Sequence, residues 1–241
     1  MWSEQNIAGK IADVFEPSTK PRFAVIFLHG IGLEILHGNA PYTDILKKQN
    51  LACVCPHGQR SWWLDRVCAE FDPSVSPEKY LLESVVPYCR ARWQLAPRAL
   101  GVFGISMGGQ GALRLALRHA QVFPVAAGIA SAFDFQESYG QGSPLDDMYT
   151  SKEQCRQDTA LMHIPRHDPP PHLFFCIDPE DADWFRGNDR FDEKLTALGV
   201  PHTIDFTTSA GGHTWEYFNR MAEPTLRFVV EGLEKESRRL L

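Results

Sequence analysis

The residues around Ser106 constrain the fold more than any other stretch of the chain. Ala99–Phe103 has the composition of a short buried β-strand, and Gly104-Ile105-Ser106-Met107-Gly108 follows without a gap. From Ala112 onward, apolar residues recur every three to four positions, which is typical of one face of a helix. A strand that turns into a helix at a G-x-S-x-G pattern holds the serine in a strained conformation and exposes its hydroxyl. We therefore interpret Ser106 as a nucleophile rather than as part of a turn without chemistry.

Alternating apolar strands and helical patterns predict the architecture of the whole chain. The run Phe23–Leu28 is continuously apolar, as in a strand buried on both faces of a parallel sheet. Further strands are predicted at Leu51–Cys55, Ala99–Phe103, Pro124–Ser131, His172–Ile177 and His202–Thr207, with an edge strand at Ile7–Phe15. Helices are predicted at 41–49, 77–93, 189–198 and 214–239, with a kink or break expected at Pro87 and a break near Pro224. This order favours one α/β domain over residues 1–241, with a mostly parallel central sheet and helices on both faces.

Two segments between the predicted strands have no strong periodic pattern. The loop at residues 56–77 carries the adjacent Trp62 and Trp63, and loops of this length inside compact domains are usually functional or disordered. Two tryptophans favour order, so we expect this loop to pack over another part of the protein. The segment 136–165 is irregular and rich in Gly, Ser and Asp, and we interpret it as a short lid insertion.

The composition argues against several kinds of partner. The 241 residues carry a formal net charge of −6, which argues against nucleic acid. Apolar runs such as Phe23–Leu28 are far too short to span a bilayer. The polar start Met1–Asn6 lacks the pattern of a signal peptide, and the six cysteines have no spacing typical of zinc sites. We therefore expect a cytoplasmic protein without a metal, a cofactor or a membrane partner.

A serine nucleophile needs a base, and nine histidines compete for that role. A serine hydroxyl reacts when a base lies within hydrogen-bond reach and a carboxylate orients that base. In this kind of fold the order along the chain is serine, acid, histidine. Only His213 follows the last predicted strand, in the glycine-rich loop Gly211–Trp215, so we select it as the base. The spacing of His163 and His167 suits a metal on a helix, but Pro165 between them disfavours a regular helical turn.

The acid that would orient His213 is less narrowly defined. The candidates are carboxylates after the two preceding strands: Asp134, Asp178, Glu180, Asp181 and Asp183. Asp178 lies so close to the end of its strand that its reach is short, and Asp183 leads directly into Trp184. We choose Asp181 and keep the others as alternatives, because any one of them can equally be a solvated loop acid or a helix N-cap.

The tetrahedral intermediate of ester cleavage needs two converging N–H donors. The backbone N–H of Met107, one residue after the predicted nucleophile, is one candidate. The second should come from the loop after Leu28, with Ile31 as the first choice and Gly32 as the next. His29 in the same loop is interpreted as structural, supporting the backbone beside the nucleophile.

Three motifs together resemble the α/β-hydrolase superfamily. They are Leu28-His29-Gly30-Ile31-Gly32, Gly104-Ile105-Ser106-Met107-Gly108-Gly109 and Gly211-Gly212-His213-Thr214-Trp215. Within it, the last two are similar to the putative-esterase branch, which contains esterase D (S-formylglutathione hydrolase), feruloyl and acetylxylan esterases and the mycolyltransferases. The matches span about residues 23–220. The resemblance implies the α/β-hydrolase fold, with Ser106 as nucleophile, His213 as base, and Met107 and Ile31 as donors of the oxyanion hole.

The function indicated is hydrolysis of small to medium acyl esters through a serine acyl-enzyme. Acyl transfer to a sugar or thiol acceptor uses the same three side chains and stays open as an alternative. A non-catalytic ligand-binding module that retains the fold is a third possibility. Aromatic side chains are candidate walls of the substrate pocket because they offer a large apolar contact area. These candidates are Trp62, Trp63, Tyr139, Tyr149 and Trp215.

Overall fold

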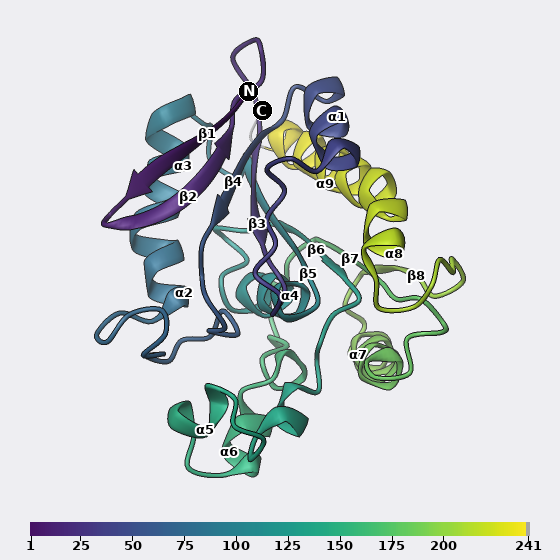
Figure 1. The fold of residues 1–241 in the computed structure, drawn as a ribbon. Helices are drawn as coiled ribbons and strands as arrows, with labels where there is room; N and C mark the ends of the chain where they lie inside the picture. Colours follow the sequence, from purple (N-terminus) through teal and green to yellow (C-terminus); the bar gives the residue numbers. More distant parts are fainter. Residues whose placement is uncertain (240–241) are drawn as a thin grey trace.

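One eight-stranded sheet runs through the computed structural model, which describes residues 1–239 (Figure 1). The strands are β1 Trp2–Ile7, β2 Lys10–Phe15, β3 Ala24–Leu28, β4 Ala52–Pro56, β5 Leu100–Ile105, β6 Val125–Ile129, β7 His172–Cys176 and β8 Thr203–Asp205. Their order across the sheet is β1-β2-β4-β3-β5-β6-β7-β8. The pairs β1–β2 and β2–β4 are antiparallel, and from β4 to β8 every neighbouring pair is parallel. This is the mostly parallel sheet of the α/β-hydrolase fold.

Helices cover both faces of this sheet. They are α1 Ala40–Lys48, α2 Pro77–Tyr80, α3 Val86–Trp93, α4 Met107–Arg118, α5 Leu145–Met148, α6 Lys152–Gln157, α7 Phe185–Ala197, α8 Trp215–Arg220 and α9 Ala222–Arg238. One hydrophobic core lies between the sheet and α3, α4 and α7, and a second lies between the sheet and α1, α8 and α9. The central strands are buried on both faces, which explains why β3 and β5 read as continuous apolar runs.

The N-terminal edge of the sheet differs from the sequence-based expectation. A single edge strand was predicted over Ile7–Phe15, whereas the structure has a hairpin of β1 and β2 with the turn at Ala8-Gly9. Both turn residues have positive φ angles, 50° and 85°, as a type I′ hairpin turn requires. The predicted strand therefore ran through the turn, because alanine is a poor signal for a left-handed conformation.

Pro87 was expected to kink or break its helix, and the structure shows no break. The chain continues from α2 through a π-helical segment, Leu81–Val85, into α3. Proline has no N–H to donate to the preceding turn, and a widened π turn is one way to absorb that missing hydrogen bond without ending the helix. The predicted break at Pro224 lies instead at Met221, between α8 and α9.

The segment 136–165 forms short helical pieces beyond the sheet, at the bottom of Figure 1. It is attached to α4 by a buried ion cluster around Arg114, which is fully buried. The Arg114 side chain donates to the Asp158 backbone carbonyl at 2.8 Å and to Glu78 at 2.5 Å, and it also pairs with the Asp158 carboxylate. Tyr149 donates to the same carboxylate at 2.7 Å. These contacts fix one end of the segment to the helix that begins next to Ser106.

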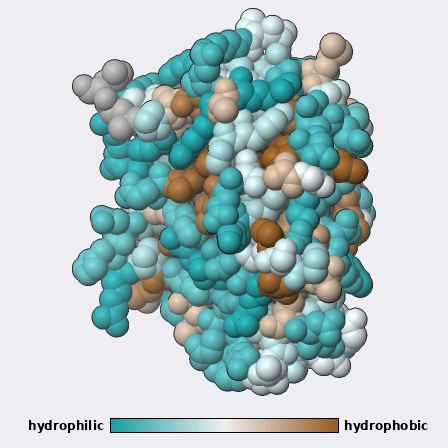
Figure 2. Space-filling model, turned by 90° about the vertical axis from the view of Figure 1, so that its left-hand side faces the viewer, coloured by the Kyte–Doolittle hydropathy of each residue, from teal (hydrophilic) through white to brown (hydrophobic). Residues whose placement is uncertain are grey.

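The molecular surface on the side of the β1–β2 hairpin is mostly hydrophilic, with hydrophobic residues in separate small patches (Figure 2). Among residues 1–239, no helix combines the length and the apolar character needed to cross a bilayer.

The start of α4 lies in close backbone contact with the end of β3. A Cβ atom built on Gly108 would be 1.8 Å from the Leu28 carbonyl oxygen, and one on Gly104 would be 2.2 Å from the Gly108 carbonyl oxygen. No side chain fits there, since the obstructing atoms are backbone and cannot swing away. The two glycines therefore allow strand, turn and helix to meet at this point.

Replacing Gly108 by alanine should lower the free energy of unfolding by about 3 kcal/mol, because β3 or α4 must shift to remove the overlap. Chemical denaturation followed by far-UV circular dichroism measures this loss. Gly38→Ala is the matched control, since Gly38 has a φ of 88° but no atom within 4 Å of its built Cβ. That change should cost only the backbone strain, about 1 kcal/mol. Equal losses in the two variants would contradict the packing argument.

Candidate active site

Ser106 lies at the turn between β5 and α4 in a backbone conformation that few residues adopt. Its φ and ψ are 56° and −117°. The Ser106 N–H donates to the Ile129 carbonyl at 2.8 Å, and its carbonyl accepts from the N–H groups of Gly109 at 3.0 Å and Ala132 at 3.1 Å. These bonds hold the strained residue between β6 and the first turn of α4. The side chain consequently points out of the turn, and Ser106 as a whole is 7% exposed.

His213 lies within hydrogen-bond distance of Ser106. The distance from His213 Nε2 to Ser106 Oγ is 2.9 Å, and from His213 Nδ1 to Asp181 Oδ2 it is 2.6 Å. With the proton on Nδ1, the imidazole donates to the carboxylate and leaves Nε2 free to accept the serine proton. Phe218 packs edge-on against the ring at a centroid distance of 5.2 Å, which restrains its rotation. The structure thus brings together three residues that are far apart in the sequence.

Asp181 is the one acid of the candidate set that contacts His213. Its carboxylate is almost fully buried, and Oδ1 accepts the Trp184 N–H at 3.1 Å, which leaves Oδ2 directed at the imidazole. Glu180 and Asp183 are exposed, and Asp134 pairs with Arg190 at the start of α7. Their side chains make no hydrogen bond to His213 among the described residues.

Asp178 has a role that the sequence analysis missed. This fully buried carboxylate accepts three backbone N–H groups, from Glu180 at 2.8 Å, Ala210 at 2.6 Å and Gly212 at 3.0 Å. Burial alone would raise the pKa of Asp178, but the three donors outweigh it, and the pKa lies below its usual value. Asp178 therefore ties the loop that carries His213 to the loop that carries Asp181.

The two backbone N–H groups predicted as oxyanion donors have no hydrogen-bond partner within residues 1–239. They belong to Met107, the first residue of α4, and to Ile31 in the loop after β3. The Ile31 loop runs beside the serine, because a Cβ built on Gly30 would lie 3.4 Å from the Ser106 Cβ. Free donors at a helix start and in an adjacent loop are the arrangement that can stabilise a developing oxyanion.

The buried side chain of His29 holds the loop that contains Ile31 in place. It is 1% exposed, its Nδ1 lies 2.8 Å from the Gly30 carbonyl oxygen, and its Nε2 accepts the Gly58 N–H at 3.0 Å. Burial lowers the pKa of the His29 imidazole to about 4, although the bond to Gly30 opposes that shift. The ring is therefore neutral at physiological pH, which is the state that allows it to donate from one nitrogen and accept at the other.

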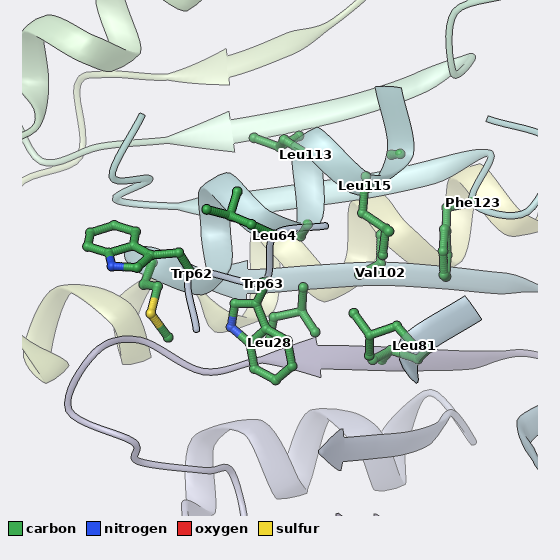
Figure 3. Close-up of a cluster of buried hydrophobic side chains, with 14 of the residues drawn as sticks. Leu28, Trp62, Trp63, Leu64, Leu81, Val102, Leu113, Leu115 and Phe123 are labelled. Atoms are coloured by element: carbon green, nitrogen blue, oxygen red, sulfur yellow. The ribbon is translucent and has the colours of Figure 1, made fainter. Parts of the chain in front are cut away.

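The tryptophans expected in the substrate pocket lie in two different environments. Trp62 and Trp63 are 2% and 1% exposed, within the hydrophobic core next to the end of β3 (Figure 3). Enclosed on all sides, they do not fit the predicted role of pocket walls. Trp215 is half-buried, one turn before Phe218 and close to His213. Tyr149 is buried in the Arg114 cluster, and Tyr139 is half-buried against the core.

A groove of about 470 Å³ is lined in part by Ala182, the residue after Asp181. It runs between the residues after β6 and the start of α7, and Gln136, Trp184 and Arg186 are among the residues that line it. Within residues 1–239, no group of three or more His, Cys, Asp or Glu side chains has the geometry of a metal site. His163, one of the two histidines considered for a metal, instead contacts Asp158 at 2.9 Å.

Residues 14–227 match the family model described as putative esterase. This match covers most of the chain, including every residue of the geometry above. The chain belongs to the putative esterase family. It is accordingly an ester-hydrolysing enzyme.

Solved structures share its fold at low sequence identity. A ferulic acid esterase superposes with a TM-score of 0.76 at 16% identity, covering 96% of this chain and 98% of its own. The fluorophosphonate-binding serine hydrolase FphF from Staphylococcus aureus gives 0.78 at 18% identity, covering 95% and 97%. An S-formylglutathione hydrolase from Agrobacterium tumefaciens gives 0.76 at 16% identity, covering 97% and 94%. No curated protein sequence matches the enzyme.

Replacing Asp178 by asparagine should destabilise the loop that carries His213. An amide oxygen accepts more weakly than a carboxylate, and its NH₂ group faces backbone donors, so we expect a loss of about 2 kcal/mol in unfolding free energy. Ester turnover should fall as well, because His213 loses its fixed position. Asp189→Asn is the control: Asp189 is exposed in α7, and its replacement should change both quantities little. Comparable behaviour of the two variants would contradict the anchoring role.

The depressed pKa of His29 predicts a pH-dependent loss of stability in acid. The unfolded imidazole titrates near pH 6.5 and the folded one near 4, so the unfolded state binds more protons between these values. The free energy of unfolding should therefore fall as the pH drops from 6.5 to 4, by about 3 kcal/mol from this group. His29→Gln removes the titration, and urea unfolding at several pH values should show a smaller acid loss in this variant. Parallel curves would refute the assignment.

Proposed function

We propose that the enzyme hydrolyses carboxylic esters through a covalent acyl-enzyme on Ser106, with His213 and Asp181 completing the catalytic triad. The observation that carries this proposal is the continuous chain of short contacts, 2.9 Å from Ser106 Oγ to His213 Nε2 and 2.6 Å from His213 Nδ1 to Asp181. Each residue has an environment suited to its role: a strained serine at a helix start, a partly exposed imidazole and a buried carboxylate.

The reaction proceeds in two halves. His213 Nε2 takes the serine proton as Ser106 Oγ attacks the ester carbonyl, and Asp181 stabilises the imidazolium that forms. The carbonyl oxygen becomes an oxyanion between the N–H groups of Met107 and Ile31, and the start of α4 adds favourable electrostatics. His213 then protonates the leaving alcohol. In the second half the same imidazole activates a water molecule, which releases the acid and restores the serine.

Several features around the triad support small to medium acyl esters as substrates. Ile31 is 45% exposed in the loop that passes beside the serine, and the half-buried Trp215 lies two residues after His213, so both loops of the site carry apolar surface for a substrate. The 470 Å³ groove at Ala182 provides further space for a substrate group. We assign to segment 136–165 the role of a lid that borders this groove, since Gln136, Glu137 and Ser138 line it.

The decisive experiment compares Ser106→Ala with Ser131→Ala. Removal of the nucleophile should lower kcat for p-nitrophenyl acetate by ~10⁶-fold and abolish labelling by a fluorophosphonate probe. Ser131 is a matched control because it is fully buried near the same turn and its hydroxyl has no hydrogen-bond partner within residues 1–239. That variant should retain turnover and labelling. Parental turnover in purified, folded Ser106→Ala would overturn the proposal.

A further inference from the structure

We propose that Trp63 is a positioning residue for the oxyanion hole, and that its indole N–H sets the direction of the Ile31 N–H through the backbone of His29 and Gly30. This inference rests on the proposed function, because it concerns a donor of the same hole. Trp63 Nε1 donates to the His29 carbonyl oxygen at 3.1 Å. Trp63 is 1% exposed, so it acts from beneath the site without touching a substrate.

The geometry of two consecutive peptide units links this hydrogen bond to the oxyanion donor. The His29 carbonyl, which Trp63 holds, belongs to the peptide between His29 and Gly30. The next peptide contains both the Gly30 carbonyl and the Ile31 N–H, and because a peptide is planar these two groups point in opposite directions. The Gly30 carbonyl accepts from Leu33 N–H at 3.1 Å and lies 2.8 Å from the His29 ring. With both carbonyls held, the Ile31 N–H has one available direction.

Trp63 is itself held rigidly. A Cβ built on Gly58 would lie 2.2 Å from its ring, and one built on Gly111 would lie 2.7 Å from its Cβ, so two glycines enclose the side chain. Its backbone has a φ of 56°, which is a strained value for a bulky residue. The His29 ring packs edge-on against the indole at a centroid distance of 5.0 Å. The indole therefore has little freedom to move away from the His29 carbonyl.

Gln110 connects this arrangement to the other donor of the hole. It lies in the first turn of α4, where its N–H bonds to the Ser106 carbonyl at 3.2 Å. Its buried side-chain amide donates to the Trp62 carbonyl at 2.6 Å, in the peptide that leads into Trp63. The helix that presents Met107 thus holds the residue that orients the Ile31 loop. A single network of hydrogen bonds sets the spacing between the two donors.

The neighbouring tryptophan supplies a matched control within the same turn. Trp62 is 2% exposed and has a φ of 55°, close to the values for Trp63. Its indole N–H has no hydrogen-bond partner within residues 1–239, and only its backbone carbonyl takes part in the network. Changing either tryptophan to phenylalanine removes one ring and one N–H from the core. Only the change at position 63 removes a hydrogen bond to the loop after β3, the one that the Trp63 indole donates to the His29 carbonyl.

The experiment compares Trp63→Phe with Trp62→Phe in the purified full-length enzyme. For p-nitrophenyl acetate, kcat of Trp63→Phe should fall about tenfold or more while KM stays within about twofold. The reason is that a misdirected donor stabilises the transition state less but leaves the binding of the substrate in its ground state unchanged. Its rate of labelling by a fluorophosphonate should fall in parallel, and the midpoint of its pH–kcat profile should not move. Trp62→Phe should keep the parental kcat.

Each outcome decides the proposal. Equal kcat values for the two variants, or a fall in Trp63→Phe that lies entirely in KM, would overturn it. If Trp63→Phe does not fold, Gln110→Met replaces it: a lowered kcat at unchanged KM supports the network, and a parental kcat refutes it. The Ser106→Ala variant distinguishes a failure of the proposed function from a failure of the role of Trp63. Full activity in that variant ends the proposed function, whereas its inactivity together with equal tryptophan variants ends only the role of Trp63.

Discussion

The strained backbone of Ser106, with its positive φ, is the constraint on which the rest of the site depends. A conformation of this kind costs on the order of 1–3 kcal/mol and persists only where its surroundings determine it completely. Here β6 accepts the Ser106 N–H, α4 and the Ala132 N–H bond to its carbonyl, and the absence of a side chain at Gly108 lets α4 start against β3. The same contacts bring the loop after β3 beside the serine. One strained residue therefore determines where three strands and a helix meet.

Asp178 and Asp181, three residues apart, have different roles because their carboxylates face different partners. Asp178 faces backbone N–H groups, and its charge is used to join two loops. Asp181 contributes only one oxygen to the backbone and directs the other at His213. The first carboxylate sets the position of the imidazole and the second contacts it. Both carboxylates are buried, and the position of His213 depends on the pair, because one anchors its loop and the other contacts its ring.

The parts of this structure that the sequence predicted are those coded by local patterns. The apolar runs predicted the parallel strands, and the order of motifs along the chain selected Ser106 and His213. For the acid the sequence left five candidates, of which we chose Asp181 by its distance from the strand end. The fold brings His213 within hydrogen-bond distance of both Ser106 and Asp181. Local patterns carry no information about which buried side chain meets which carbonyl. From the sequence, Trp63 was therefore predicted to be a pocket wall. Its hydrogen bond to His29, 34 positions away, became visible only in the three-dimensional structure. The prediction of a single edge strand through Ala8 was wrong for a related reason, since an alanine in the sequence does not indicate a positive φ angle.

The groups that fix the loop containing Ile31 are neutral, and this has an electrostatic consequence. Burial keeps the His29 imidazole uncharged, and the other donors are an indole and backbone or side-chain amides. A cation at the position of His29 would attract negative charge toward the loop interior and away from the N–H groups that face the substrate. It would also carry a large desolvation cost beneath a site that must stay rigid. Neutral donors orient the loop without competing for the charge that develops on the substrate oxygen. In the proposed mechanism that charge is then left to the N–H groups of Met107 and Ile31, whose directions are set before the substrate arrives.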